Sequence, residues 1–225
     1  MLFMQPWGKP RMSLIVNEIF FSIQGESTHA GLPCIFIRLT GCNLRCTYCD
    51  TTYAYAEGQR REIEDVLKII GTYPCQRIAI TGGEPLLQSG TPKLITEIIE
   101  SGCEVILETN GSFDIGQVDR RCHRIVDVKC PGSGEQDSFD YNNLQHLNSN
   151  DQVKFVIGDR EDYDFAQKFL VDLPNRLPRG NRLFSPHMTK LAPADMAAWI
   201  LADGLDVRLH LQQHKFIWPG IERGV

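Results

Sequence analysis

Short apolar runs alternate with polar, glycine-containing segments along most of the chain. Runs rich in β-branched and aromatic residues predict strands at 14–23, 34–40, 77–81, 104–108, 124–129, 152–157, 182–185 and 206–212. Apolar residues at helical spacing, or a proline in the first turn, predict helices at 62–72, 92–101, 161–173 and 193–203, with a shorter helix at 141–147. Such alternation is typical of a parallel sheet built from βα units.

About six or seven of these eight runs are clear strands, fewer than the eight of a closed TIM barrel, and 225 residues are few for that fold. We therefore expect an α/β fold with an abbreviated, open (βα) barrel of about six parallel strands. No composition shift marks a domain boundary, so the sequence predicts one domain over residues 1–225, with residues 1–13 as a flexible lead.

Composition narrows the class of protein further. Hydrophobic residues make up 42% and charged residues 23%, as in ordinary globular proteins, and the net charge of −5 argues against nucleic acid as a partner. No apolar run has the length of a membrane span, and residues 1–11 lack the apolar centre of a signal peptide. These features predict a cytoplasmic protein with reduced cysteines.

Three of the eight cysteines stand close together, as Cys42, Cys46 and Cys49. A structural zinc site needs four ligands, and no fourth cysteine or histidine follows at a fitting distance. Three thiolates can instead bind three irons of a four-iron cluster and leave the fourth iron open to a small molecule. The remaining cysteines have no metal-binding spacing and are expected to be small buried residues.

Polar segments follow the ends of the predicted strands. They are the cysteine triplet and residues 82–85, 108–111, 129–134, 185–187 and 213–215. Because the carboxyl ends of parallel strands share one rim, where ligands bind in such folds, we expect these segments to meet around one site.

The CxxxCxxC spacing resembles that of the radical S-adenosylmethionine (SAM) superfamily. Gly82-Gly83-Glu84-Pro85 is similar to the segment that binds the amino group of SAM in that superfamily. The resemblance implies a 4Fe-4S cluster bound by Cys42, Cys46 and Cys49, and a radical from SAM that removes a hydrogen from the substrate. It also implies SAM contacts by Tyr48, Cys49, Asp50, Gly83, Glu84, Lys129, Ser133 and Ser185.

Several further segments together resemble the 7-carboxy-7-deazaguanine synthase family. They are residues 17–20, 22–27, 31–33, 36–39, 41–51, 81–85, 108–111, 127–134 and 211–215. The resemblance implies a lyase that converts 6-carboxy-5,6,7,8-tetrahydropterin to 7-carboxy-7-deazaguanine with loss of ammonia, on the route to queuosine, a tRNA modification. It further implies Mg2+, a reduced electron donor such as flavodoxin, and a homodimer.

The resemblance also assigns substrate-binding residues, and their chemistry suits a pterin. Gln24 and Glu26 match ring donors and acceptors, and the planar guanidinium of Arg38 suits a carboxylate. The same resemblance places Thr51 on Mg2+, with the substrate carboxylate and waters as further ligands. The remaining substrate contacts expected are Ile23, Gly25, Thr81 and His214. One departure is Ser27, where the family leads us to expect glycine.

Two other interpretations remain open from the sequence. A glycyl-radical-enzyme activase would share the cysteine triplet and a compact barrel, but it would not need the polar set of Gln24, Glu26 and Arg38. A zinc-binding interaction module would need a fourth ligand, and it would leave the polar strand ends unexplained.

Overall fold

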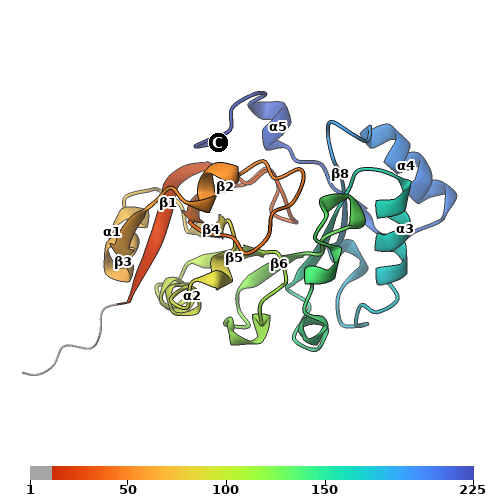
Figure 1. Cartoon of the computed structure of the whole chain (residues 1–225). Helices are drawn as coiled ribbons and strands as arrows, with labels where there is room; N and C mark the ends of the chain where they lie inside the picture. Colours follow the sequence, from red (N-terminus) through yellow and green to blue (C-terminus); the bar gives the residue numbers. More distant parts are fainter. Residues whose placement is uncertain (1–11) are drawn as a thin grey trace, which may run out of the picture.

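The computed structural model describes residues 12–225, which form one nine-stranded sheet in the order β3-β1-β2-β4-β5-β6-β7-β8-β9 (Figure 1). The strands are β1 (Ser13–Ile23), β2 (Pro33–Leu39), β3 (Gln59–Glu62), β4 (Arg77–Gly82), β5 (Glu104–Thr109), β6 (His123–Asp127), β7 (Gln152–Ile157), β8 (Arg182–Pro186) and β9 (Arg208–Leu209). The α-helices are α1 (Ile63–Ile70), α2 (Thr91–Glu100), α3 (Arg160–Phe169), α4 (Pro193–Ala202) and α5 (His214–Ile217).

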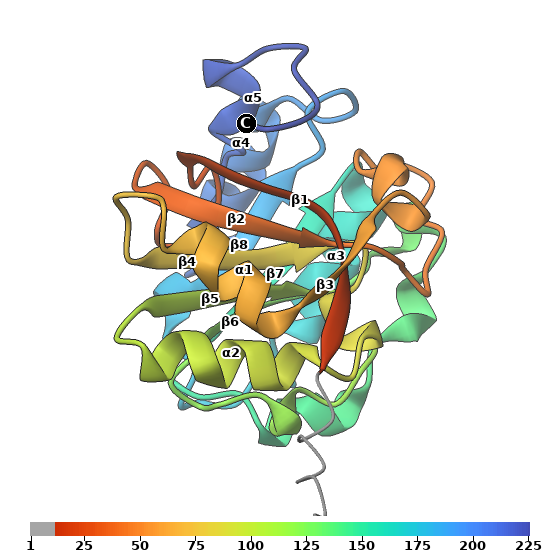
Figure 2. The same cartoon turned by 90° about the vertical axis from the view of Figure 1, so that its left-hand side faces the viewer.

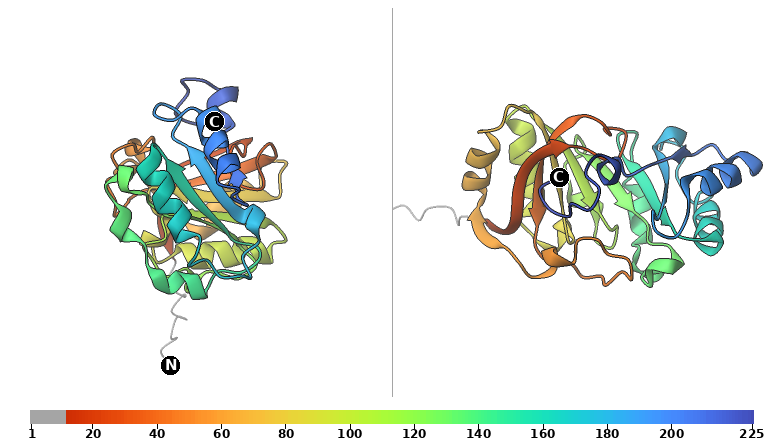
Figure 3. Two further views of the ribbon diagram at one scale, coloured as in Figure 1. Left: turned by 90° about the vertical axis from the view of Figure 1, so that its right-hand side faces the viewer. Right: turned by 90° about the horizontal axis from the view of Figure 1, so that it is seen from above.

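From β2 to β9 every pair of neighbouring strands is parallel, which confirms the open partial barrel. The sheet curves around an open centre, and α1 to α4 cover its outer face (Figures 1 and 2). The C-terminal segment with α5 lies across the open side, between the β1–β2 edge and β8 (Figures 1 and 3). Within residues 12–225, no helix is both long and apolar enough to cross a bilayer.

Three predictions about the strands need correction. β1 runs antiparallel to β2, and β3, which the sequence pattern did not predict, pairs antiparallel with β1. Gln59–Glu62 reads QRRE, without the apolar residues that mark a strand, because it lies at the sheet edge and is half-exposed. The last strand covers only Arg208–Leu209 instead of 206–212. The predicted lead of residues 1–13 lies outside the described part except for Met12 and Ser13, and Ser13 already belongs to β1.

The central strands are buried on both faces, as parallel strands usually are. In β4, Ile78 and Ile80 belong to the main core under the helices, whereas Ala79 belongs to a small inner core. That inner core comprises Cys34, Phe36, Ala79, Ile106 and Ile125, with Phe20 packed against it. It fills one end of the barrel and leaves the other end to polar side chains.

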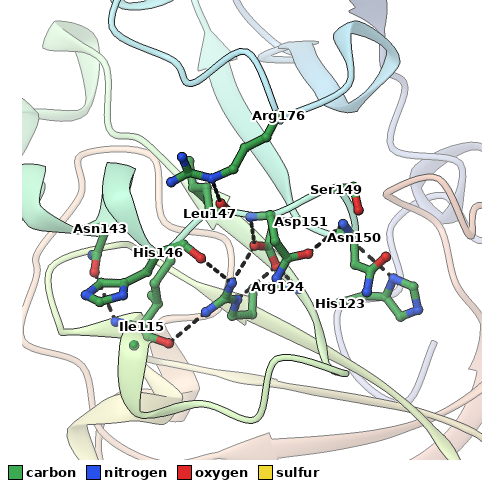
Figure 4. Close-up of polar contacts among 12 residues, drawn as sticks. Ile115, His123, Arg124, Asn143, His146, Leu147, Ser149, Asn150, Asp151 and Arg176 are labelled. Carbon is green, nitrogen blue, oxygen red and sulfur yellow. Dashed lines mark hydrogen bonds and ion pairs between the residues drawn. The ribbon is translucent and has the colours of Figure 1, made fainter.

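A buried ion pair joins the beginnings of β6 and β7. Arg124 is 1% exposed and donates from Nε to Asp151 Oδ1 over 2.8 Å (Figure 4). Its Nη1 donates to the carbonyl of Ile115 and its Nη2 to that of His146. Asp151 in turn accepts from the backbone N–H of Asn148. This network supplies partners for both charges, which a buried pair requires.

Candidate active site

A cavity of about 810 Å³ occupies the polar end of the barrel. Cys42, Cys46 and Cys49 line it on one side. Polar side chains of the strands and of the 212–215 segment line the rest. Of the residues implied by the resemblance, the cavity is lined by Ile23, Gln24, Gly25, Glu26, Arg38, Cys42, Cys46, Tyr48, Cys49, Asp50, Thr51, Thr81, Gly83, Lys129 and His214. The tertiary structure therefore brings together segments that are up to 191 residues apart, from Ile23 to His214 (214 − 23).

Three of the implied SAM contacts do not line the cavity. Glu84 is fully buried, and its carboxylate accepts hydrogen bonds from the Leu86 and Asn110 backbone and from the Thr109 hydroxyl. These bonds tie the Gly82–Pro85 loop to the end of β5, while burial raises the pKa of Glu84. Glu84 therefore supports this loop, because its carboxylate accepts hydrogen bonds from protein groups.

The other two residues outside the cavity lining are serines. Ser133 is fully buried and donates its hydroxyl hydrogen to the Cys130 carbonyl, so it closes a local turn. Ser185 is 1% exposed, and its hydroxyl has no hydrogen-bond partner within residues 12–225. Buried hydroxyls without partners are uncommon, so Ser185 is the one of the two that still has hydrogen-bonding capacity to offer.

The cysteine loop fits a cluster with several irons. All three cysteines are free thiols. Within residues 12–225, their sulfur atoms do not form a group close enough together to bind a single metal ion. Burial raises the pKa of Cys42 and of Cys46, and the nearby Lys129 opposes that rise. The backbone N–H of Leu44 also points to Cys42 Sγ at 3.4 Å. A positive side chain and an N–H donor are what bound thiolates need, so these residues suit a four-iron cluster.

An ion-pair network spans the floor of the cavity. Lys154 Nζ lies 2.7 Å from Glu26 Oε2 and 3.5 Å from Asp127 Oδ2, and Lys129 Nζ lies 3.0 Å from the same Asp127 oxygen. Burial alone would raise the pKa of Glu26, but the charge of Lys154 holds that pKa well below its usual range. The buried charges are therefore mutually compensated.

Glu108 adds a second buried carboxyl group next to this network. Thr81 donates its hydroxyl hydrogen to Glu108 Oε2 over 2.9 Å, and Gln24 Nε2 donates to Oε1 over 3.3 Å. Burial and the charge of Glu26 raise the pKa of Glu108. This group offers a planar ligand one further site for hydrogen bonds.

Arg38 lies on β2 directly beside Thr81 of β4, and its side chain faces Glu18 of β1. Its Nε donates to Glu18 Oε1 over 2.7 Å, and the Tyr53 hydroxyl donates to the same oxygen. Within the described chain, its Nη1 and Nη2 atoms make no hydrogen bond. Because the side chain is only 13% exposed and lines the cavity, these donors are available to an anionic group there.

Sequence reasoning placed Glu108 in a polar strand-end segment without giving it a role of its own, and it assigned no role to Asp127 or Lys154. Glu108 and Lys154 stand in strands whose other residues are mostly apolar, as Arg38 does, and Asp127 follows two buried apolar residues at the end of β6. A charge in a buried strand needs a partner, so the same signal that singled out Arg38 was present for all three. The register places Asp127 directly opposite Lys154, which the sequence alone did not reveal.

The structure shows how serine is accommodated at position 27, where the family resemblance led us to expect glycine. Its backbone has a φ of 67°, in the left-handed region that glycine adopts without strain. The strain is offset locally, since the Ser27 N–H donates to His210 Nε2 over 2.7 Å and its hydroxyl oxygen accepts from the His29 N–H. The loop keeps the shape that a glycine would give it.

Comparisons with known proteins agree with this geometry. The Radical SAM superfamily model matches residues 36–132. In fold, the chain is similar to QueE from Escherichia coli, with a TM-score of 0.75 at 24% identity over 90% of this chain and 95% of that one. Fold and cysteine loop thus define a radical SAM enzyme, a class that uses a 4Fe-4S cluster and SAM, acts here on a small molecule and takes electrons from a reductant.

Two full-length relatives give the family. A protein of Koribacter versatilis named 7-carboxy-7-deazaguanine synthase is 42% identical over 93% of this chain and 99% of its own length. A protein of the same name from Chlorobaculum tepidum is 40% identical over 94% of this chain and 97% of its own length. This chain belongs to the 7-carboxy-7-deazaguanine synthase family, which confirms the interpretation of its motifs. Neither the activase nor the zinc-module interpretation is supported.

Proposed function

We propose that this chain converts 6-carboxy-5,6,7,8-tetrahydropterin to 7-carboxy-7-deazaguanine and ammonia, and that residues 1–225 form the one domain that carries the reaction. The supporting observation is that the three free cysteines and the polar set of Gln24, Glu26, Arg38 and Thr81 line the same cavity. The ring loses one nitrogen as ammonia, and the overall change needs no net oxidant. Bound at the cysteine loop, the cluster and SAM supply the radical that starts the ring contraction.

We assign each part of the substrate to particular residues of the cavity. Arg38 offers Nη donors to the carboxylate, while Gln24, Thr81 and Glu108 present an amide, a hydroxyl and a carboxyl group to the pterin edge. Glu26 belongs to the same surface, with its charge compensated by Lys154. Ile23, Gly25 and His214 complete the substrate wall in this proposal. The inner core beneath them excludes water from one end of the barrel.

The SAM side is assigned to the opposite wall. Tyr48, Asp50, Gly83 and Lys129 line the cavity next to the cysteines, and Asp50 is held by Lys215, whose Nζ lies 3.0 Å from Asp50 Oδ2. Ser185 supplies a hydroxyl that has no hydrogen-bond partner within residues 12–225, and Glu84 and Ser133 act by holding their loops. Thr51 lies beside Asp50 in the cavity wall and is proposed to hold Mg2+ together with the substrate carboxylate.

The finer partner assignments belong to the same proposal. Free cysteines and an iron–sulfur cluster fit a reducing compartment, so we place the reaction in the cytoplasm with flavodoxin or a similar donor. We also propose a homodimer, as the family resemblance implies. Light scattering of the purified chain measures the oligomeric state, and a monomer at micromolar concentration would contradict that part.

The test of the function is anaerobic turnover. Reconstituted protein with SAM, Mg2+, dithionite and carboxytetrahydropterin should form 7-carboxy-7-deazaguanine and ammonia in equal amounts, measured by mass spectrometry and an ammonia assay. Cys42→Ala, Cys46→Ala and Cys49→Ala should each abolish SAM cleavage, whereas Cys103→Ser, outside the cavity, should not. SAM cleavage without pterin consumption would overturn the proposed substrate and leave the radical SAM class intact.

A further inference from the structure

A second group of ligand-type side chains lies at the N-terminal ends of the strands, on the opposite rim from the cavity. Glu104 begins β5, His123 begins β6, and His29 comes from the loop between β1 and β2. One ligand atom from each of the three lies within 4.8 Å of the others. None of the three lines the catalytic cavity. We propose that His29, Glu104 and His123 bind a divalent metal ion of the zinc type.

Both histidines turn the same ring nitrogen toward one carboxylate oxygen. His29 Nε2 lies 2.9 Å from Glu104 Oε1, and His123 Nε2 lies 3.5 Å from that same atom. Their rings meet edge to face with centroids 4.9 Å apart. Two imidazole nitrogens and one carboxylate oxygen are the donor set of three-ligand zinc sites, in which a water takes the fourth position.

The other ring nitrogens have partners of the kind that orient metal ligands. His123 Nδ1 lies 3.3 Å from the carbonyl oxygen of Asn150 (Figure 4). A carbonyl only accepts, so that Nδ1 carries the hydrogen, and a neutral His123 presents a lone pair at Nε2. His29 Nδ1 lies 3.4 Å from the Ser27 hydroxyl oxygen. In known metal sites an outer bond to a backbone carbonyl, like that of His123, fixes the tautomer, whereas the Ser27 hydroxyl can donate or accept and so serves either tautomer of His29.

This arrangement calls for a cation between the three groups. The Nε2 lone pair of a neutral His123 and the Glu104 carboxylate oxygen would otherwise face each other as two acceptors. The site is also accessible, because the Glu104 and His123 side chains are 33% and 28% exposed. A metal ion with one water therefore has both a reason to bind and a path to enter.

Arg77 sets the charge of the site. Its Nε lies 2.7 Å from Glu104 Oε2, the oxygen that faces away from the histidines. It therefore orients the carboxylate with Oε1 toward the two histidines, while its positive charge lowers the affinity for a cation. Arg77→Gln should consequently raise the metal affinity, an effect opposite to that expected if the group were only a network of ion pairs.

A metal here would brace the floor of the catalytic cavity. His29 lies in the same loop as Gln24 and Glu26, and the Thr28 N–H already donates to Gln152 of β7 over 2.9 Å. A bound ion would add a link from this loop to β5 and β6. Because it binds only the folded chain, Zn2+ at a hundredfold excess over its Kd should raise Tm by roughly 5–10 °C.

The test uses cluster-loaded protein, so that the three cavity cysteines are already occupied. Isothermal titration with Zn2+ should show one site. Glu104→Gln and His123→Gln, made separately, should each weaken binding by more than about tenfold, since outer-shell changes alone have effects of that size. His146→Gln, at an exposed histidine paired with Asp114 on another part of the surface, is the matched control and should leave the affinity unchanged.

Two results would overturn the proposal. One is the absence of Zn2+ binding by cluster-loaded wild-type protein, which would mean that a proton occupies the position between His123 and Glu104. The other is equal Zn2+ affinity of wild type, Glu104→Gln and His123→Gln. The two variants change different elements, and retention of the brown cluster shows that each is folded.

Discussion

Lys154 and Glu26 are 128 residues apart in the chain, and their side chains meet in a buried ion pair of 2.7 Å. Gln212 donates to the other oxygen of Glu26, so the pair also joins the C-terminal segment to the β1–β2 loop. Burial would lower the pKa of Lys154, but Glu26 and Asp127 raise it well above its usual value. The pair therefore holds together three parts of the cavity wall.

Lys154→Met should destabilise the fold strongly. It leaves the Glu26 carboxylate buried without its cation, which typically costs about 3–5 kcal/mol and corresponds to a fall in Tm of roughly 6–20 °C for a chain of this size. Calorimetry of the reconstituted protein measures it. Lys168→Met, at an exposed position in the last turn of α3, is the control. Glu26→Gln combined with Lys154→Met should recover part of the loss, and a double variant less stable than Lys154→Met would contradict the pairing.

Arg38→Lys should impair substrate use without affecting SAM cleavage in the absence of substrate. Lysine keeps the positive charge but loses the planar pair of Nη donors, so KM for the pterin should rise about ten- to hundredfold, equivalent to about 1.5–3 kcal/mol. Steady-state kinetics measure the change. Arg60→Lys, on the exposed edge strand β3, serves as the control. An unchanged KM in Arg38→Lys would remove Arg38 from the substrate carboxylate.

His210 should make the fold less stable as the pH falls from 6.5 to 4. Burial lowers the pKa of His210 from 6.5 to about 4. Between these values the unfolded chain binds a proton that the folded chain does not, so stability falls with pH by up to about 3 kcal/mol and then levels off. Urea unfolding at several pH values measures this.

His210→Gln isolates this contribution from that of the other histidines. Glutamine has no proton to gain, and its carbonyl oxygen can still accept the Ser27 N–H that His210 Nε2 accepts over 2.7 Å. The variant should therefore show a flatter pH dependence between pH 6.5 and 4. Equal slopes for the two proteins would show that His210 titrates normally.

Arg124→Met should destabilise the chain, whereas the same change at the neighbouring Arg121 should not. The Arg124 side chain is 1% exposed and its removal leaves Asp151 buried without a cation, at a cost of about 3–5 kcal/mol. Arg121 pairs with Asp119 on the surface, where such pairs contribute little. Thermal unfolding compares the two variants. Equal Tm values would show that the buried pair contributes no more to stability than the surface pair.

The interpretation from the sequence succeeded where the chemistry is local. Cys42, Cys46 and Cys49 belong to one loop, so their spacing alone indicates a cluster with an open iron. The βα pattern predicted the parallel part of the sheet for a similar reason, since apolar runs report burial directly. Glu84 shows the limit of such reasoning: the motif was visible, but the direction of its carboxylate depends on Thr109 and Asn110 at the end of another strand.

The sequence by itself determined the class of protein, the cysteine triplet and the polar segments at the strand ends, because each is encoded by residues that are neighbours in the chain. Only the tertiary structure decided which charges meet. Lys154 with Glu26, Asp127 with Lys154, and His29 with Glu104 and His123 arise from strand register and from one loop folding beneath the barrel. Register depends on the packing of the whole sheet, so no local pattern can specify these pairs.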